Sequence, residues 1–472
     1  MHFANEIDNI ICRTVSECAE KLSVEAFLVG GAVRDLLLQR PSNDLDFVCT
    51  GKSAELAKAC AKKLGNVKVT IFKNYGTAHF KYNNCDLEFV AARKESYSAE
   101  SRNPSVSPGT LKDDQLRRDF TINAMAISLA KEEFGALIDP FGGLQDLHNA
   151  VIRTPADPDI TFSDDPLRMM RAIRFSAQLQ SSIEEQCLNA IQRNAERILI
   201  VSAERIMTEF NKIMMCPKPY YGLSLLFDCG LLQKFFPELA RLHGIERRNG
   251  IAHKDNFYHT LQVLDNVCET SDNLWLRWAA LLHDIAKPPT KRFEAEHGWT
   301  FHGHEDMGAR MVPKIFSRLK LPLDHQMRYV QKLVLLHLRP IALTKEDISD
   351  SAVRRLLFEA GDDIDDLMIL CKADITSKNE SKVKRYLKNY EILKQKLIDL
   401  EERDRIRNFQ PPVTGEEIMQ IFGIAPCKEV GVIKNAIKEA ILDGIIANEK
   451  QDAMNLMYEE AQKLGLQPMP LK

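Results

Sequence analysis

The chain has 472 residues, 45% of them hydrophobic and 27% charged, which is typical of a soluble globular protein of about three domains. Its 63 basic and 66 acidic residues give a net charge of −3, so any polyanionic partner must be met by local basic patches. No apolar run could span a membrane, no secretory signal is readable, and the 11 cysteines form no CxxC pair, so we expect a cytosolic protein with free thiols.

Residues 1–150 predict a mixed α/β domain. Helical stretches such as 53–64 alternate with short β-rich runs, at 26–29, 45–49, 67–72, 78–82 and 87–90. A segment rich in Ser, Pro and Gly at 96–109 predicts a flexible loop within this domain. From about Asp164 the strand signals cease, and helices follow, with a linker at 401–414 before a small helical C-terminal unit.

A glycine pair, Gly30 and Gly31, lies between the first predicted strand and an amphipathic helix at 32–38. Paired glycines let the backbone approach a ligand closely, and a helix N-terminus offers free N–H groups to phosphate. An ordinary tight turn has the same pattern, so the glycines alone do not identify a site.

Carboxylates at alternate positions mark two of the predicted strands. Asp44 and Asp46 face the same way on one strand, and Asp86 and Glu88 do so on another. Two carboxylates side by side repel each other unless a cation lies between them, and Mg²⁺ prefers such oxygen ligands. A third carboxylate from the second strand would complete a two-metal site for phosphoryl transfer, whereas a solvated strand end is the alternative for a lone Asp-x-Asp.

Two further segments complete a recognisable pattern, Leu-Arg-Arg-Asp-Phe-Thr-Ile-Asn-Ala-Met-Ala at 116–126 and Asp-Asp-Pro-Leu-Arg-Met-Met-Arg-Ala-Ile-Arg-Phe at 164–175. Together with the glycines and acids they resemble class II tRNA nucleotidyltransferases, a polymerase-β-like family that includes bacterial poly(A) polymerases. The resemblance runs from residue 27 to about 214 and more loosely beyond. It implies an α/β nucleotidyltransferase head of mixed sheet and helices (1–150) and a mostly α-helical remainder, with a neck (151–240), an HD domain or body (241–400) and a tail (401–472).

The resemblance also implies roles for individual residues of the head. Asp44 and Asp46 would hold Mg²⁺, and Glu88 matches the third catalytic carboxylate. Contacts to the phosphates and ribose of the nucleotide are implied for a second group, Gly31, Arg34, Arg118, Asp119 and Asn123.

In this family the base is selected by an acid and an arginine of a Glu-Asp-x-x-Arg motif, matched here by Asp165 and Arg168 with Asp164 where Glu is usual. Three residues apart on a helix, a carboxylate and a guanidinium can bind the amino group and ring nitrogen of cytosine or adenine and reject the carbonyl of uracil. Arg171 and Arg174 continue the spacing and join the predicted nucleotide site. The alternative for this arginine row is a solvated basic face.

The resemblance favours one activity within the family. Residues 70–80 look like the CCA-adding pattern rather than the corresponding stretch of poly(A) polymerases, and 95–109 is similar to the flexible element with which CCA-adding enzymes switch from C to A. It therefore implies Mg²⁺-dependent, two-metal addition of CCA to the tRNA acceptor end from CTP and ATP, with release of pyrophosphate. A-only addition and poly(A) synthesis are the alternatives, and the oligomeric state stays open.

Histidines of the helical part form a second constellation. The spacing resembles an HD-domain metal site, with ligands expected from His259, His283, Asp284, His304, His337 and Asp374. Such a site could bind a divalent metal and hydrolyse phosphoesters, so an HD phosphohydrolase with a nucleotide-binding head is a further alternative. A lone histidine is usually a buried core residue, but six candidate ligands in the order of the HD family favour a metal site. The basic segment 377–397, with Tyr386 and Tyr390, fits either an RNA-binding face or a solvated helix.

Overall fold

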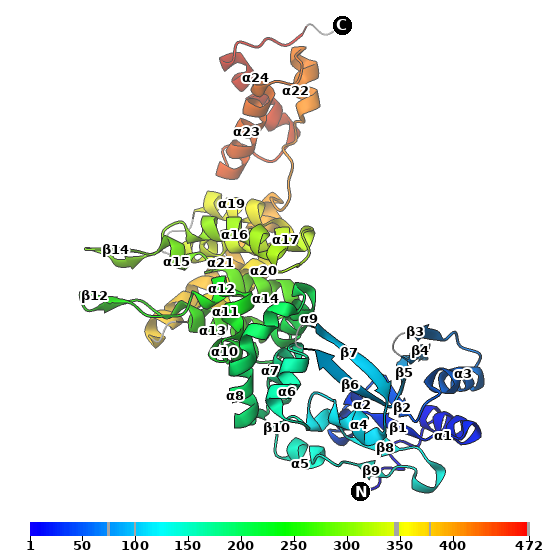
Figure 1. Cartoon of the computed structure of the whole chain (residues 1–472). Helices are drawn as coiled ribbons and strands as arrows, with labels where there is room; N and C mark the ends of the chain where they lie inside the picture. Colours follow the sequence, from blue (N-terminus) through cyan, green and yellow to red (C-terminus); the bar gives the residue numbers. More distant parts are fainter. Residues whose placement is uncertain (73–75, 99–100, 344–348, 377–378, 470–472) are drawn as a thin grey trace. The chain divides into compact units, whose positions relative to one another are not determined.

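The computed structural model describes residues 1–72, 76–98, 101–343, 349–376 and 379–469 (Figure 1). Two compact units divide the chain, Met1–Pro237 and Glu238–Lys472. No helix among the described residues is long and apolar enough to cross a bilayer.

The first unit is built on a mixed sheet of seven strands in the order β3-β4-β5-β2-β1-β8-β9. All neighbours are antiparallel except β2 and β5, which run parallel. The mixed-sheet prediction is confirmed, and all five predicted strands are present, although the third begins at Thr70 rather than at 67. The strands are β1 (Ala26–Val29), β2 (Asp44–Cys49), β3 (Thr70–Phe72), β4 (Thr77–Tyr82), β5 (Cys85–Ala91), β8 (Ala126–Ser128) and β9 (Leu137–Ile138).

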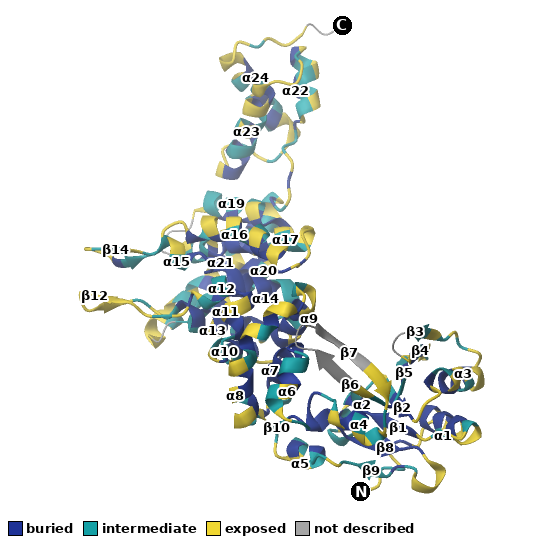
Figure 2. Ribbon diagram, in the orientation of Figure 1, coloured by how far each residue is buried: buried dark blue, intermediate teal, exposed yellow. Residues whose placement is uncertain are grey.

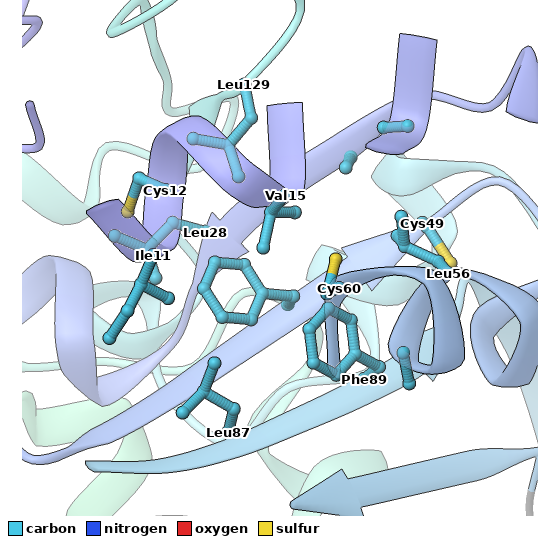
Figure 3. Close-up of a cluster of buried hydrophobic side chains, with 14 of the residues drawn as sticks. Ile11, Cys12, Val15, Leu28, Cys49, Leu56, Cys60, Leu87, Phe89 and Leu129 are labelled. Carbon is cyan, nitrogen blue, oxygen red and sulfur yellow. The ribbon is translucent and has the colours of Figure 1, made fainter. Parts of the chain in front are cut away.

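Alternate residues of β1 enter cores on opposite faces of this sheet. Leu28 joins the larger core, which includes buried residues of α1 (Ile10–Leu22) and α3 (Ser53–Lys63) and is shown in Figure 3. Phe27 and Val29 join a smaller core with Val48 and Ala126. In Figure 2 the buried residues of α3 are dark and its outer face is exposed. Because both faces are covered, the β-rich run at 26–29 has no alternation of polar and apolar residues.

The predicted loop at 96–109 is wrong for the residues that the structure describes there. A hairpin of β6 (Arg93–Ser98) and β7 (Ser101–Pro108) occupies this stretch, while 99–100 lie outside the described residues. Its register shifts between Ser96 and Ser98, and Pro104 falls at this irregularity. A proline has no N–H to donate to a ladder and is tolerated at a bulge, which is why a Pro- and Ser-rich segment can still form strands.

Helices complete the first unit. They are α2 (Gly31–Leu37), α4 (Leu111–Leu116), α5 (Gly143–His148), α6 (Pro158–Asp164), α7 (Leu167–Leu179), α8 (Glu185–Asn194), α9 (Ala203–Met214), α10 (Pro219–Asp228) and α11 (Leu231–Phe235), with α12 (Pro237–Ala240) at the boundary. The central helix, α7, packs on α9 and α10 and is buried along most of its length.

The second unit is almost entirely helical. It contains α13 (Asn256–Cys268), α14 (Leu274–Leu282), α15 (Lys287–Thr290), α16 (His304–Arg318), α17 (His325–Leu336), α18 (Leu338–Leu343), α19 (Asp350–Ala360), α20 (Ile364–Asp374), α21 (Glu380–Asp404), α22 (Gly415–Phe422), α23 (Lys428–Asp443) and α24 (Lys450–Lys463).

Three features of the helical remainder differ from the sequence-based expectations. Strands do not cease at Asp164, since β11 (Ser182–Ile183) pairs with β10 (Val151–Ile152), and two short hairpins follow, β12–β13 (Arg247–Arg248, Ile251–Ala252) and β14–β15 (Arg292–Glu294, Gly298–Thr300). The predicted linker starts later than 401, because α21 continues to Asp404. Tyr390 is buried, so its ring cannot serve an RNA-binding face of α21. Strands of two or three residues are too short to leave an alternating pattern in the sequence.

We predict that Phe89→Ala lowers the free energy of unfolding by about 3–5 kcal/mol, since the ring is fully buried. It stacks on Phe47 and Phe80, with centroids 5.1 and 5.6 Å away. Urea unfolding measures the change. The control Phe72→Ala removes a half-exposed ring from β3 and should cost less than about 0.5 kcal/mol. Equal losses in both variants would contradict the placement of this core.

Candidate functional site

The predicted acids meet at one end of the two central parallel strands. The register of β2 and β5 places Asp44 opposite Asp86 and Asp46 opposite Glu88, so all four side chains share one face. Asp86 is paired with His79 at 2.8 Å and with Lys81 at 3.1 Å. Asp44 and Glu88 are exposed and have no such partner within the described residues. Three carboxylates, Asp44, Asp46 and Glu88, are therefore available to a cation.

Asp46 carries the electrostatic signature of this cluster. Burial, and secondarily the nearby charges of Glu88 and Asp44, raise the pKa of its carboxyl to about 6, while Arg118 opposes the shift. A bound divalent cation would relieve both the burial cost and the repulsion. The donor set of carboxylate oxygens thus fits a Mg²⁺-type ion.

Gly30 brings the turn between β1 and α2 close to these acids. Its φ of +74° is in the left-handed region, and a Cβ there would lie 2.9 Å from Arg118 Nη1 and 3.3 Å from Asp46 Oδ2. A side chain at residue 30 would therefore push the arginine away from the carboxylate. Gly31, for which the resemblance implies a contact to the triphosphate, is less confined, since a Cβ there would make only an ordinary contact, 3.6 Å from Arg34 Nη2.

A buried network of hydrogen bonds joins α2 to α7 through the segment after α4. Arg34 Nη1 donates to Asn123 Oδ1 at 2.8 Å, and Asn123 Nδ2 donates to Asp119 Oδ1 at 3.1 Å. Arg171 Nε donates to Asp119 Oδ2 at 2.7 Å. Burial alone would raise the pKa of Asp119, but the charge of Arg171 and the bond from Asn123 outweigh it, and the pKa lies below its usual value. The structure thus brings together four of the predicted residues.

Next to this hydrogen-bond network lies a cavity of about 380 Å³. It is lined by Arg117, Arg118, Asp119, Asp165, Leu167, Arg168, Arg171, Arg205, Thr208 and Glu209. Asp165 and Arg168, the predicted base-selecting pair, therefore share one cavity with Asp119 and Arg171. Arg168 Nη2 donates to the carbonyl oxygen of Arg117 at 2.7 Å, which fixes the guanidinium at the wall.

Asp165 differs from its predicted place on a helix face. It lies just before α7 with extended backbone, and its carboxylate accepts the N–H of Leu167 at 3.2 Å. The following Pro166 explains this, because a residue before proline is driven out of the helical region. The carboxylate and Arg168 still line the same cavity, so the pairing survives without a shared helix.

Two predicted residues lie elsewhere. Arg174 is buried, donates to Glu209 Oε2 at 2.6 Å and to Gln178 Oε1 at 2.8 Å, and lies 3.9 Å from the centroid of Phe175. It does not line the 380 Å³ cavity. Asp164 lines a second cavity, of about 290 Å³, which shares Arg117 and Arg168 with the first.

Sequence reasoning gave no individual role to several residues that the structure places here. Buried Asp114 accepts hydrogen bonds from Arg118 Nε at 3.2 Å and Nη2 at 3.1 Å, and from Arg117 Nε at 3.0 Å, and so holds both arginines. Arg117, Arg205, Thr208 and Glu209 line the cavity. The Asp-x-x-Arg-Arg spacing around α4 could have indicated the first of these contacts.

The six predicted ligands of the second unit converge. Nε2 of His259 lies 3.0 Å from Asp374 Oδ1, and Nε2 of His283 lies 3.2 Å from Asp284 Oδ2. On the other side of Asp284, its Oδ1 lies 3.3 Å from Nε2 of His304, which is 3.3 Å from Nε2 of His337. Two overlapping ligand groups result, with Asp284 in both.

All four imidazoles are oriented through the other ring nitrogen. Nδ1 of His283, His304 and His337 contacts the carbonyl oxygens of Ala280, Phe301 and Val334 at 2.7–2.8 Å. Nδ1 of His259 contacts Thr376 Oγ1 at 2.9 Å. Such contacts leave Nε2 facing the acids, the arrangement that metal-binding histidines adopt.

The environment also suits metal ligands. Burial lowers the pKa of His337 to about 4 and also lowers the pKa of His259, which favours the neutral rings that metal ligation requires. For His283 the charge of Asp284 outweighs burial, and the pKa is raised. Nε2 of His283 is buried and makes no hydrogen bond within the described residues. Lys287 Nζ lies 2.5 Å from Asp284 Oδ2 and places a positive charge against this carboxylate. A cavity of about 530 Å³, lined among others by His259, Asp374 and Phe301, adjoins it.

Three segments match known protein families. Residues 26–153 match the family described as "Poly A polymerase head domain", and 182–242 match "Probable RNA and SrmB- binding site of polymerase A". Residues 256–379 match "HD domain". The first and third matches contain the two clusters of candidate ligands.

Curated relatives extend over most of the chain. An A-adding tRNA nucleotidyltransferase of Deinococcus radiodurans is 30% identical over 88% of this chain and 91% of its own length. A Multifunctional CCA protein of Ectopseudomonas mendocina is 35% identical over 64% of this chain and 72% of its own. A CC-adding tRNA nucleotidyltransferase of Thermus thermophilus is 29% identical over 94% and 97%.

Solved structures agree with these relatives. A tRNA nucleotidyltransferase complexed with a primer tRNA and an incoming ATP analog is 25% identical with a TM-score of 0.57, covering 81% of this chain and 99% of its own. A CCA-adding enzyme with ATP shares the fold at 19% identity, with a TM-score of 0.65 over 98% and 99%.

We predict that the purified protein holds a divalent metal ion that His283→Ala and Asp284→Ala lose, because each removes a ligand from the centre of the cluster. Elemental analysis by mass spectrometry gives the metal content per chain. His297→Ala, a control in the β14–β15 turn, should retain it. Equal metal in all variants would show that the ion lies elsewhere.

Proposed function

Because the chain belongs to the tRNA nucleotidyltransferase family, we propose that it adds C, C and A in turn to the 3′ end of tRNA, from CTP and ATP. The head would join the α-phosphate of the nucleotide to the terminal hydroxyl of the tRNA and release pyrophosphate. The observation that carries this proposal is the single cavity in which Asp165 and Arg168 lie beside Asp119 and Arg171.

Catalysis would depend on Asp44, Asp46 and Glu88. These side chains share one face at one end of the sheet, where a bound cation would offset the mutual repulsion of their charges. We assign them two Mg²⁺ ions, which when bound would lower the pKa of the attacking hydroxyl and stabilise the leaving pyrophosphate.

Arginines of the head would bind the phosphates. Arg118 lies beside Asp46 and Gly30 and is held there by the buried carboxylate of Asp114. A guanidinium fixed in this way can donate two hydrogen bonds to phosphate oxygens without first being ordered. Asp119 and Asn123, linked to Arg34, would position the ribose end of the same nucleotide.

The base would be read by Asp165 and Arg168. The carboxylate can accept from the amino group that cytosine and adenine share, and the guanidinium can donate to the adjacent ring nitrogen. Uracil presents a carbonyl oxygen, a hydrogen-bond acceptor, at the position where the carboxylate needs a hydrogen-bond donor. One pair of side chains can thus accept both substrates, which supports addition of C as well as A.

Sequencing the 3′ ends made on a tRNA that lacks CCA, with CTP and ATP supplied singly and together, tests this proposal. We expect CC with CTP alone, no addition with ATP alone and CCA with both. Addition of A only to a tRNA ending in CC would assign the A-only activity, and long A tails would assign a poly(A) polymerase.

A second function is favoured by the histidine cluster. We propose that the cluster formed by His259, His283, Asp284 and Asp374, extended by His304 and His337, holds a divalent metal and hydrolyses phosphoesters such as terminal or 2′,3′-cyclic phosphates. The oriented imidazoles and the adjoining cavity support it.

We predict that Asp46→Ala lowers the rate of transfer by about three decades, since several kcal/mol of transition-state stabilisation depend on the metal site. Binding of tRNA, measured by filter binding, should change less than about threefold. Substantial C and A incorporation by this variant would contradict the catalytic assignment.

Arg168→Ala should impair the choice of base more than the binding of metal. The loss of a charged hydrogen bond is worth about 1.5–3 kcal/mol, or one to two decades of discrimination. Comparing kcat/KM for CTP, ATP and UTP measures it, with Lys58→Ala, which removes an exposed cation of α3, as a control outside the cavity. An unchanged preference for CTP over UTP would remove Arg168 from the reading pair.

The two sites should separate by mutation. Asp284→Ala is expected to lose the metal and any phosphoester hydrolysis while CCA addition continues, because each site uses only its own ligands. Thermal melting by circular dichroism shows whether the variant is folded. A folded Asp284→Ala protein that no longer adds nucleotides would show that the sites are coupled.

A further inference from the structure

One wall of the 380 Å³ cavity has no role in the function proposed above. It belongs to α9, which contributes Arg205 and, one turn later, Thr208. Both side chains are exposed, whereas Ile206 and Met207 between them are buried in the helix bundle. The amphipathic helix therefore directs an arginine into the cavity as a consequence of how it packs.

The other arginines of this cavity already have protein partners. Arg117 and Arg118 are held by Asp114, Arg171 by Asp119, and Arg168 by the carbonyl oxygen of Arg117. Arg205, by contrast, has no side-chain hydrogen bond or ion pair to any residue that the structure describes. Its five N–H groups are available to a ligand.

The nearest acids do not neutralise Arg205. Glu209 also lines the cavity, but its Oε2 accepts from Arg174 at 2.6 Å and its Oε1 lies 3.1 Å from Lys212 Nζ. Glu204 is adjacent in sequence, and neighbouring residues of a helix do not face each other. The hydroxyl of Thr208 donates to the carbonyl of Glu204 at 2.8 Å, so the free donors of this wall belong to Arg205.

An unpaired, exposed guanidinium beside a nucleotide cavity is suited to a phosphate group. The reaction offers two kinds, the triphosphate of the incoming nucleotide and the phosphodiesters of the RNA. In the proposed function the triphosphate is bound by Arg118, which lies beside Gly30, and by the Mg²⁺ ions that the carboxylates would hold. In an in-line displacement the attacking hydroxyl approaches opposite the leaving pyrophosphate, so the RNA backbone enters from another side.

We infer that Arg205 binds a phosphodiester of the last nucleotides of the tRNA primer and so aligns its 3′ hydroxyl. Arg205 also lies inside the segment 182–242 that matches an RNA-binding family. The inference rests on the proposed function, because it requires that the 380 Å³ cavity be the one where nucleotide and primer meet.

The test compares the KM for primer tRNA with the KM for the nucleotide, on the primer that the wild-type protein extends. Arg205→Ala should raise the KM for tRNA about tenfold and reduce the slope of log binding constant against log salt by about one. The KM for the nucleotide should stay within about twofold. Arg205→Lys should recover most of the loss, since it restores the charge.

Lys58→Ala serves as the matched control, since Lys58 is an exposed cation on α3 outside the cavity. It should change neither KM. A higher KM for the nucleotide with an unchanged KM for tRNA would assign Arg205 to the triphosphate and overturn the inference, as would no change in either KM. Failure of the wild-type protein to transfer any nucleotide would instead refute the proposed function.

Discussion

A buried carboxylate, Asp119, is the group on which the arrangement of the head depends. It accepts from Asn123 on one side and from Arg171 of α7 on the other, while Asn123 accepts from Arg34 of α2. A charge taken out of water is tolerated only when it is paired and hydrogen-bonded, so these groups hold one another in a single geometry. The sheet that carries the acids and the helix that carries Arg168 are thereby fixed relative to each other.

The sequence predicted the parts of this arrangement better than their orientation. The strands predicted at 45–49 and 87–90 follow from their β-rich residues, and the paired acids follow from the period of two. The order of the strands along the chain could not show that β2 and β5 are adjacent. Their pairing and register place Glu88 opposite Asp46. Gly30 rather than Gly31 makes the close approach, and only the positive φ shows which of the two glycines is needed.

Burial and partners account for the remaining differences. Arg174 continues a regular three-residue spacing from Arg168 and Arg171, but it faces Glu209 of α9 and is buried. Spacing gives the direction of a side chain on its own helix and says nothing about which element covers it. The β6–β7 hairpin was predicted as a loop for a related reason. Whether a segment forms a strand depends on the strand against which it pairs, and its own composition does not show that partner.

The candidate sites of the two units differ in their ligands and in their exposure to solvent. The head presents carboxylates near solvent, suited to a hard ion and a departing substrate, whereas the second unit encloses imidazoles whose orientation is fixed by backbone carbonyls. The relatives are named as A-adding, CC-adding and CCA proteins, so the family resemblance leaves the product open, and analysis of the added 3′ nucleotides must decide it.

A crystal structure of the protein with CTP and Mg²⁺ would test the central claim most directly. The account predicts that the cytosine amino group donates to Asp165, that Arg168 donates to the ring edge, and that the triphosphate lies between Arg118 and the carboxylates of Asp44 and Asp46. Cytosine bound outside the cavity, with Asp165 and Arg168 unchanged, would contradict it.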